Sequence, residues 1–155
     1  MTALELKEEF VKRGRTLGCV ESFTGGLFAE TITSISGASK FYKGGYITYA
    51  TEEKINLLSI PKDIIDRFGV VSKEIAYYMA NNGRQLLNTD YCVSFTGNAG
   101  PDAMEGKPVG EIHMCIACAA SAQVYSLRLE GNRKDIQQQA VEYILEKLKE
   151  VLEKL

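Results

Sequence analysis

Ser22 stands where an apolar run, residues 17 to 20, gives way to a Thr-Gly-Gly turn and then to a helical pattern. A hydroxyl at such a strand end is exposed and lies beside the unpaired N–H groups of a helix start, which favour negative charge. Nucleophilic hydrolases need this combination, an oxygen that attacks and donors that hold the oxyanion. We therefore expect Ser22 to be a nucleophile, with the backbone of Thr24, Gly25 and Gly26 beside the oxyanion.

A nucleophilic serine needs a base. The single histidine, His113, lies in the middle of an apolar strand, where a structural role is expected, so a Ser-His-Asp triad has little support. A lysine is the alternative base, and Lys54 lies one turn beyond a predicted strand that ends at Tyr49. Burial would lower the lysine pKa towards neutrality, and Tyr49 could relay the proton. The competing interpretation is a solvated lysine paired with a neighbouring glutamate.

Two further segments could bind an anion. The loop that begins Thr96-Gly97-Asn98-Ala99-Gly100-Pro101 has small residues that let backbone N–H groups approach a ligand, and Lys107 offers a cation. This loop matches neither a P-loop nor G-x-G-x-x-G, and an ordinary long turn remains possible on sequence grounds. Arg133 lies in the first turn of the last helix, where the helix dipole disfavours a positive charge. A bound phosphate or carboxylate would offset this and pair with the guanidinium. A surface arginine is the plainer alternative.

Composition limits the class of protein. The 155 residues fit one domain, 1–155, and 45% hydrophobic with 25% charged residues is ordinary for a globular protein. A net charge of −2 argues against nucleic-acid partners, and no segment has the length of a membrane span. The four cysteines lie in apolar runs without the spacing of a zinc or redox motif, so we expect reduced core thiols and a cytoplasmic protein.

The pattern along the chain predicts an α/β layered domain with a mixed sheet and helices on both faces. In such sheets ligands bind at the carboxyl ends of strands, where Ser22, Tyr49 to Lys54 and Thr96 would meet. Thr51 and Ser72 are expected to cap helices, and Pro61 to close the helix that carries Lys54. The expected helices are 2–16, with a capping box of Thr2 and Glu5, 24–35, a short helix after 51, 73–87 and one from 132. The expected strands are 17–21, 46–49, 91–95, 111–119 and 123–129, and the short connection between the last two suggests an antiparallel hairpin. The last helix has one apolar stripe, formed by Ile136, Ala140, Ile144, Leu148, Val151 and Leu155.

Taken in order, six segments resemble the CinA C-terminal domain family, the nicotinamide-nucleotide amidases. The similarity spans nearly the whole chain, and the segments are specific as a series although each alone is modest. They are Glu21-Ser22-x-Thr24-Gly25-Gly26, Gly44-Gly45-x-Ile47-x-Tyr49 with Lys54, Gly69-Val70-Val71-Ser72, Thr96-Gly97-x-Ala99-Gly100-Pro101, Lys107-Pro108-Val109-Gly110 and Gly131-x-Arg133.

The resemblance implies hydrolysis of the carboxamide of nicotinamide mononucleotide to nicotinate mononucleotide and ammonia, in pyridine-nucleotide salvage. It implies a three-layer α/β/α sandwich with a mixed, mostly parallel five-stranded sheet, and neither a metal nor a cofactor for this step. The catalytic residues would be Ser22, Lys54, Tyr49 and Thr96. Arg133 and the loop 97–110, with Gly97, Ala99, Gly100 and Lys107, would hold the phosphate. A homo-oligomer, dimer or trimer, is expected, and the second hydrolase activity that many relatives carry in an N-terminal domain is expected to be absent.

Two departures from the family pattern concern the binding of substrate. Relatives usually continue Tyr-Ser-Asn where this chain has Tyr49-Ala50-Thr51, and they carry a Gly-Gly pair where it reads Asp102-Ala103-Met104-Glu105-Gly106. Added carboxylates near a phosphate would repel the ligand unless they point elsewhere. Two alternatives therefore stay open, a nucleotide-binding module with weak turnover and an amidase for another carboxamide.

Overall fold

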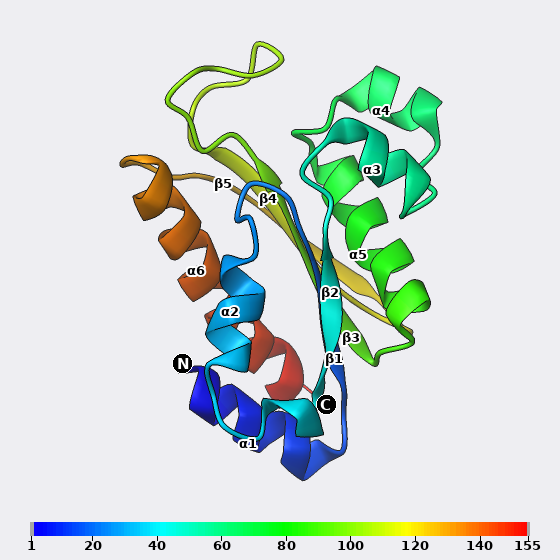
Figure 1. Cartoon of the computed structure of the whole chain (residues 1–155), viewed down its shortest axis with the longest axis vertical. Coiled ribbons are helices and arrows are strands. Elements are labelled where there is room, and N and C mark those ends of the chain that lie inside the picture. The colour runs from blue at the N-terminus through cyan, green and yellow to red at the C-terminus, as the bar shows by residue number, and fades with distance from the viewer. Residues whose placement is uncertain (1, 155) are drawn as a thin grey trace.

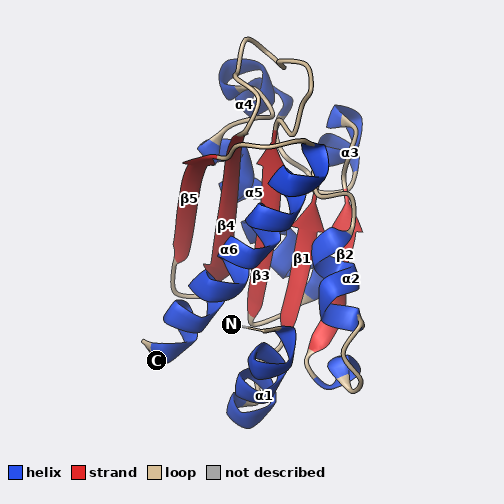
Figure 2. Cartoon of the chain, turned by 90° about the vertical axis from the view of Figure 1, so that its left-hand side faces the viewer, coloured by secondary structure: helices blue, strands red, loops and turns tan. Residues whose placement is uncertain are grey.

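The computed structural model describes residues 2 to 154. The five strands form one sheet in the order β2-β1-β3-β4-β5, in which β1 is parallel to both β2 and β3, and the β3–β4 and β4–β5 pairs are antiparallel. Only β4 therefore runs against the others (Figure 2). The elements are α1 (Ala3–Arg13), β1 (Leu17–Glu21), α2 (Leu27–Thr33), η1 (Ala38–Lys40), β2 (Tyr42–Ile47), α3 (Thr51–Asn56), α4 (Lys62–Phe68), α5 (Lys73–Leu87), β3 (Tyr91–Gly97), β4 (Glu111–Cys118), β5 (Ala122–Arg128) and α6 (Arg133–Glu153).

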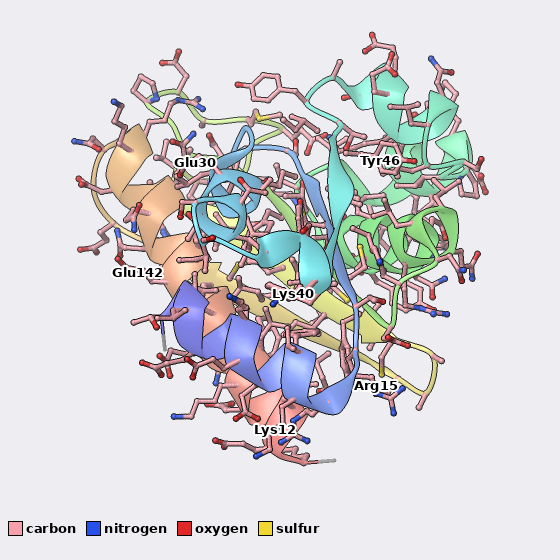
Figure 3. The ribbon with its side chains drawn as sticks, turned by 60° about the horizontal axis from the view of Figure 1, so that its bottom comes forward. Lys12, Arg15, Glu30, Lys40, Tyr46 and Glu142 are labelled. Atoms are coloured by element: carbon pink, nitrogen blue, oxygen red, sulfur yellow. The ribbon has the colours of Figure 1, made fainter. Side chains whose placement is uncertain are left out.

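The sheet is the middle of three layers, as the sequence predicted. Helices α1, α2 and α6 cover one face, while α5, with α3 and α4 beyond it, covers the other (Figure 1). All five residues of β1 are buried, because a central strand of such a sheet has a helix layer on both sides. Figure 3 views the molecule from the end where α1, which carries Lys12, lies alongside α6.

Alternate residues of the central strands divide the core into two parts. Leu17, Cys19 and Val93 face the layer of α1, α2 and α6, whereas Val20 and Cys92 face α5. The larger part contains aromatic and aliphatic side chains from helices α1, α2 and α6, among them Leu6, Phe10, Phe28, Ile136, Ile144 and Leu148, together with Phe41 and Phe95. These two cores fix the positions of the strand ends on which the candidate site stands.

Most of the predicted elements are confirmed, and the caps expected at Thr2 and Ser72 are present. Thr2 accepts a hydrogen bond from the N–H of Glu5, Ser72 accepts one from Ile75, and Asn132 and Asp135 form a complete capping box at α6. The antiparallel hairpin of β4 and β5 is also as predicted. The predicted apolar stripe of α6 is buried at Ile136, Ala140, Ile144 and Leu148, and its last member, Leu155, lies outside the described residues.

Three local predictions are wrong. Strand β2 covers Tyr42–Ile47 rather than 46–49, because Gly45 is required inside it: a Cβ there would come 2.4 Å from the Sγ of Cys19. Helix α2 begins at Leu27 rather than near 24, because Gly25 and Gly26 adopt positive φ angles of 60° and 108°.

The third error lies after Tyr49. The N-cap of α3 is Ala50, without a side-chain hydrogen bond, and Thr51 is already the first helical residue. Pro61 does not close α3, which ends at Asn56, but occupies the N-cap of α4, a helix that the sequence did not predict. Proline suits that position because its missing N–H is not needed at a helix start.

Candidate active site

Ser22 and Lys54 meet at the carboxyl end of the central strands. Ser22 directly follows β1, and its N–H donates to the carbonyl of Phe95 on β3 at 3.0 Å, so the serine continues the parallel pairing by one residue. Lys54 reaches it from α3, and its Nζ lies 3.0 Å from the Ser22 Oγ. The expected proximity of the alcohol and the amine is therefore present.

The Lys54 side chain is almost completely buried, with 1% of its surface exposed. Besides Ser22 its Nζ has one close polar partner, the carbonyl of Thr48, to which it donates at 2.6 Å. Desolvation lowers the pKa of Lys54 from 10.5 to about 8, against a smaller opposing influence of the Glu105 carboxylate. At that pKa about a tenth of the amine is uncharged at pH 7, so it can accept a proton.

Glu21 fixes the turn that carries the serine. Its buried carboxylate accepts hydrogen bonds from the N–H groups of Phe28 and Ala29, both at 2.9 Å, and so caps the start of α2. The start of α2 is therefore occupied by a side chain of the protein. An oxyanion must instead be held by the turn between Ser22 and α2.

Within this turn the Gly25 N–H donates to the Ser22 carbonyl at 3.0 Å, so it is already engaged. The N–H groups of Thr24 and Gly26 have no hydrogen-bond partner among residues 2 to 154. The Thr24 hydroxyl is also buried without a partner in this part of the chain. These are the groups beside Ser22 that can donate to a developing negative charge.

A cavity of about 160 Å³ opens in front of Ser22. Tyr49, with 64% of its surface exposed, and Met104, with 42%, stand at its opening, and the exposed Arg133 also lines it. The guanidinium of Arg133 donates to the carbonyl of Gly100 and has further N–H groups available for an anion. The lining residues are Ser22, Phe23, Tyr49, Gly97, Asn98, Ala99, Met104 and Arg133.

Two predicted residues lie close to this cavity without lining it. The Thr96 hydroxyl is buried and donates to the carbonyl of Val70 at 2.6 Å, so its proton is engaged within the protein. Lys107 donates to the carbonyl of Val71 at 2.9 Å and lies 3.8 Å from the Glu111 carboxylate. Both side chains fasten the segment before α5 in this structure, and any part that they take in binding or catalysis stays a prediction.

The sequence did not single out several residues that shape the site. Phe23, Asn98 and Met104 line the cavity, and the Thr48 carbonyl orients Lys54. Gln137 of α6 donates to the Phe23 carbonyl at 2.8 Å and supports the serine turn from the helix layer. No pattern in the sequence signals these contacts, because they join segments more than twenty residues apart or involve backbone groups.

His113 has the structural role that its position predicted. Its ring nitrogens lie 2.7 Å from the Ser126 hydroxyl and 3.0 Å from the Glu111 carboxylate, on the strands β4 and β5. All four cysteines are free thiols, and three of them are buried. Among the described residues no group of three or more histidine, cysteine or acidic side chains could hold a metal ion, and none of their helices has the length and apolar character to cross a membrane.

The chain is thus a three-layer α/β/α domain in which a strand-end serine lines a small cleft and contacts a buried lysine of α3. The CinA C-terminal domain family matches residues 2–152, and the chain belongs to this family.

Sequence relatives carry the name competence-damage inducible protein. A competence-damage inducible protein of Bacillus subtilis (strain 168) is 40% identical over 139 residues, which covers 90% of this chain and 33% of the relative. One of Bacillus cereus (strain AH187) is 41% identical over 145 residues, covering 90% and 35%. The chain thus spans about a third of the length of these relatives.

Solved structures share the whole fold. A competence-damaged protein (CinA) superfamily protein from Klebsiella pneumoniae superposes with a TM-score of 0.94 at 25% identity, and each chain is covered completely. The competence/damage inducible protein CihA from Agrobacterium tumefaciens gives a TM-score of 0.92 at 29% identity, covering 97% of this chain and 93% of the other. The α/β/α fold inferred from the sequence is therefore the fold of this superfamily.

Proposed function

We propose that this chain is an amidohydrolase that converts nicotinamide mononucleotide to nicotinate mononucleotide and ammonia. The observation that carries the proposal is the contact of 3.0 Å between the Ser22 hydroxyl and the buried amine of Lys54. A buried lysine with a pKa of about 8 costs stability and has no ion-pair partner among the described residues. Such a group is typical of a catalytic base rather than of a packing residue.

In the first half of the reaction the uncharged Lys54 amine takes the proton of Ser22 as the Oγ attacks the carboxamide carbon. A C–O bond forms, and the carbonyl oxygen becomes an oxyanion held by the free donors of the Thr24 to Gly26 turn. The C–N bond then breaks, and the leaving nitrogen departs as ammonia with the proton that Lys54 carried. Tyr49 lies at the cavity opening, from which its hydroxyl could assist this transfer.

In the second half a water molecule attacks the ester on Ser22, and Lys54 accepts a proton from it. The C–O bond to Ser22 breaks, the serine regains its proton, and the carboxylate product leaves. Arg133, which lines the same cavity as the serine, supplies the positive charge for the phosphate of the nucleotide. Thr96 and Lys107 would act by holding the segment 69–72 beside this cavity.

The test is ammonia release from nicotinamide mononucleotide by the wild type, Ser22→Ala, Lys54→Ala and Arg133→Ala. We expect both Ser22→Ala and Lys54→Ala to lose at least a thousandfold in kcat, as removal of a nucleophile or its base does. Arg133→Ala should raise KM and leave kcat nearly unchanged. Full activity of Ser22→Ala would exclude the serine mechanism.

Calorimetry with nicotinate mononucleotide separates this activity from simple binding. Tight binding by the wild type without ammonia release would favour a nucleotide-binding module of the same fold. Ammonia release from other carboxamides, at a higher kcat/KM than from nicotinamide mononucleotide, would indicate an amidase of different specificity.

A further inference from the structure

The segment 102–107 is fastened onto the turn before α5. Glu105 accepts hydrogen bonds from the N–H groups of Val70 and Val71, both at 3.1 Å. Lys107 donates to the carbonyl of Val71 at 2.9 Å, so the same turn is held by a carboxylate and by an amine. A Cβ at Gly69 would come 2.8 Å from the Glu105 carboxylate, so the absence of a side chain there makes room for it.

This attachment holds the Glu105 carboxylate on the segment before α5, away from the phosphate position proposed at Arg133. Glu105 is engaged by two backbone N–H groups on the side of α5, whereas Arg133 lies on α6. Within the segment, Met104 and Lys107 are joined by two backbone hydrogen bonds, of 3.4 Å and 2.7 Å. The segment is therefore a small hairpin, closed between Met104 and Lys107, within the yellow-green loop of Figure 1. Its Glu105 carboxylate is anchored by the N–H groups of Val70 and Val71.

The anchored hairpin presents Met104 to the cavity. Met104 lines the same cavity as Ser22 and Tyr49. Met104 is 42% exposed and Tyr49 is 64% exposed. The two side chains reach this opening from different segments, the hairpin and the connection between β2 and α3. Large apolar side chains left exposed around a cavity commonly mark a surface that a ligand covers.

The size of the cavity supports a ligand that extends past this opening. Its volume of about 160 Å³ is smaller than the roughly 300–1,000 Å³ of ordinary small-molecule pockets. A nucleotide whose reacting carbon lies at Ser22 must therefore have part of its surface outside the cavity, against Tyr49 and Met104. A thioether and an aromatic ring both pack favourably on a flat heteroaromatic ring.

We propose that Met104 and Tyr49 clamp the heteroaromatic ring of the substrate, and that Glu105 is the residue that positions Met104. The proposal rests on the function proposed above and adds to it a specificity-determining contact made by this chain's own loop. Met104 contributes binding to the ring in the ground state and the transition state alike. Its loss should therefore raise KM and leave kcat nearly constant.

The test compares Met104→Ala with Leu86→Ala, an apolar side chain of α5 that is 52% exposed and does not line this cavity. For Met104→Ala we expect KM for nicotinamide mononucleotide, and Kd for nicotinate mononucleotide, to rise about fivefold. The Kd of ribose 5-phosphate, which has the phosphate and no ring, should not change. Leu86→Ala should match the wild type in all three measurements.

The positioning role is tested by Glu105→Gln with Asp102→Asn as its control, since Asp102 belongs to the same hairpin and has no hydrogen bond or ion pair among the described residues. Glu105→Gln should raise the Kd of nicotinate mononucleotide but not that of ribose 5-phosphate, and Asp102→Asn should raise neither. If the wild type releases ammonia and Met104→Ala has the same KM and Kd as the wild type, the clamp is overturned and the amidase proposal stands. A wild type that binds the product without ammonia release would instead remove the amidase, and the Kd comparison would still decide the clamp.

Discussion

The buried lysine makes a prediction in which stability and activity change in opposite directions. Replacing Lys54 by methionine keeps an unbranched side chain of similar length and removes the amine. In the wild type the folded-state pKa of Lys54 is about 8, whereas an unfolded lysine has the ordinary value of 10.5. This difference means that burial of the charged amine lowers the unfolding free energy of the wild type by roughly 3 kcal/mol.

The direction in which stability changes with pH follows from the lowered pKa of Lys54 in the folded state. Between about pH 8 and 10.5 the unfolded chain binds more protons at this position, so wild-type stability rises with pH across that window. Below pH 8 the penalty is fully present. Lys54→Met escapes the penalty but leaves the Thr48 carbonyl without its partner, at a cost of about 1 kcal/mol. We therefore expect Lys54→Met to be about 2 kcal/mol more stable than the wild type at pH 7, with the advantage disappearing near pH 10.

Urea denaturation of both proteins at pH 7 and pH 10 measures this difference, because ionisations that the two proteins share cancel. Lys62→Met is the matched control: Lys62 is exposed and paired only with Asp66 on the surface of α4. It should show no pH-dependent difference. The reasoning is refuted if Lys54→Met is several kcal/mol less stable than the wild type at pH 7, since the amine would then stabilise the fold.

Three further predictions concern the base, the serine turn and the packing of α5. Because the base must be uncharged, kcat/KM should rise about tenfold per pH unit below the Lys54 pKa of about 8 and level off above it, whereas a flat profile from pH 6 to 9 would contradict a lysine base. Glu21→Ala should lower the unfolding free energy by about 3 kcal/mol in urea titrations, because two buried N–H groups lose their acceptor, while Glu30→Ala on the exposed side of α2 should cost under 1 kcal/mol. Gly83→Ala should destabilise by about 2 kcal/mol in thermal unfolding, despite the usual helix preference for alanine, since its Cβ would come 2.3 Å from the Cγ2 of Val20; an increase in Tm would show that α5 can move away.

The sequence predicted the layers because they depend on local patterns. Strand β1 and helix α5 stand out as an apolar run and an amphipathic period with Ser72 as cap, and both lie where expected. Strand β2 was misplaced because Gly45 is required by its close contact with Cys19 of the neighbouring strand β1, whereas strand propensity alone assigns a Gly-Gly pair to a turn. The helix α4 was missed because its seven residues are too short to show a period.

Some features of the candidate site could likewise be predicted from the sequence, and others could not. The positions of Ser22 and Arg133 follow from their places at a strand end and a helix start, both visible in the sequence. The pairing of Ser22 with Lys54 depends on how α3 turns back over the sheet, and the attachment of Glu105 to Val70 and Val71 depends on backbone groups 34 and 35 residues away. Such contacts carry no sequence signature, because any backbone N–H can serve as the donor.

The central claim is that Ser22 forms an ester with the acyl group of the substrate. Mixing the wild type with excess nicotinamide mononucleotide, quenching in acid within milliseconds to seconds, and mapping the peptides by mass spectrometry tests it directly. The account predicts a pyridine-carboxyl adduct on the peptide that contains Ser22, absent from Ser22→Ala. Steady ammonia release with no adduct at any quench time, and with undiminished rate in Ser22→Ala, would contradict it.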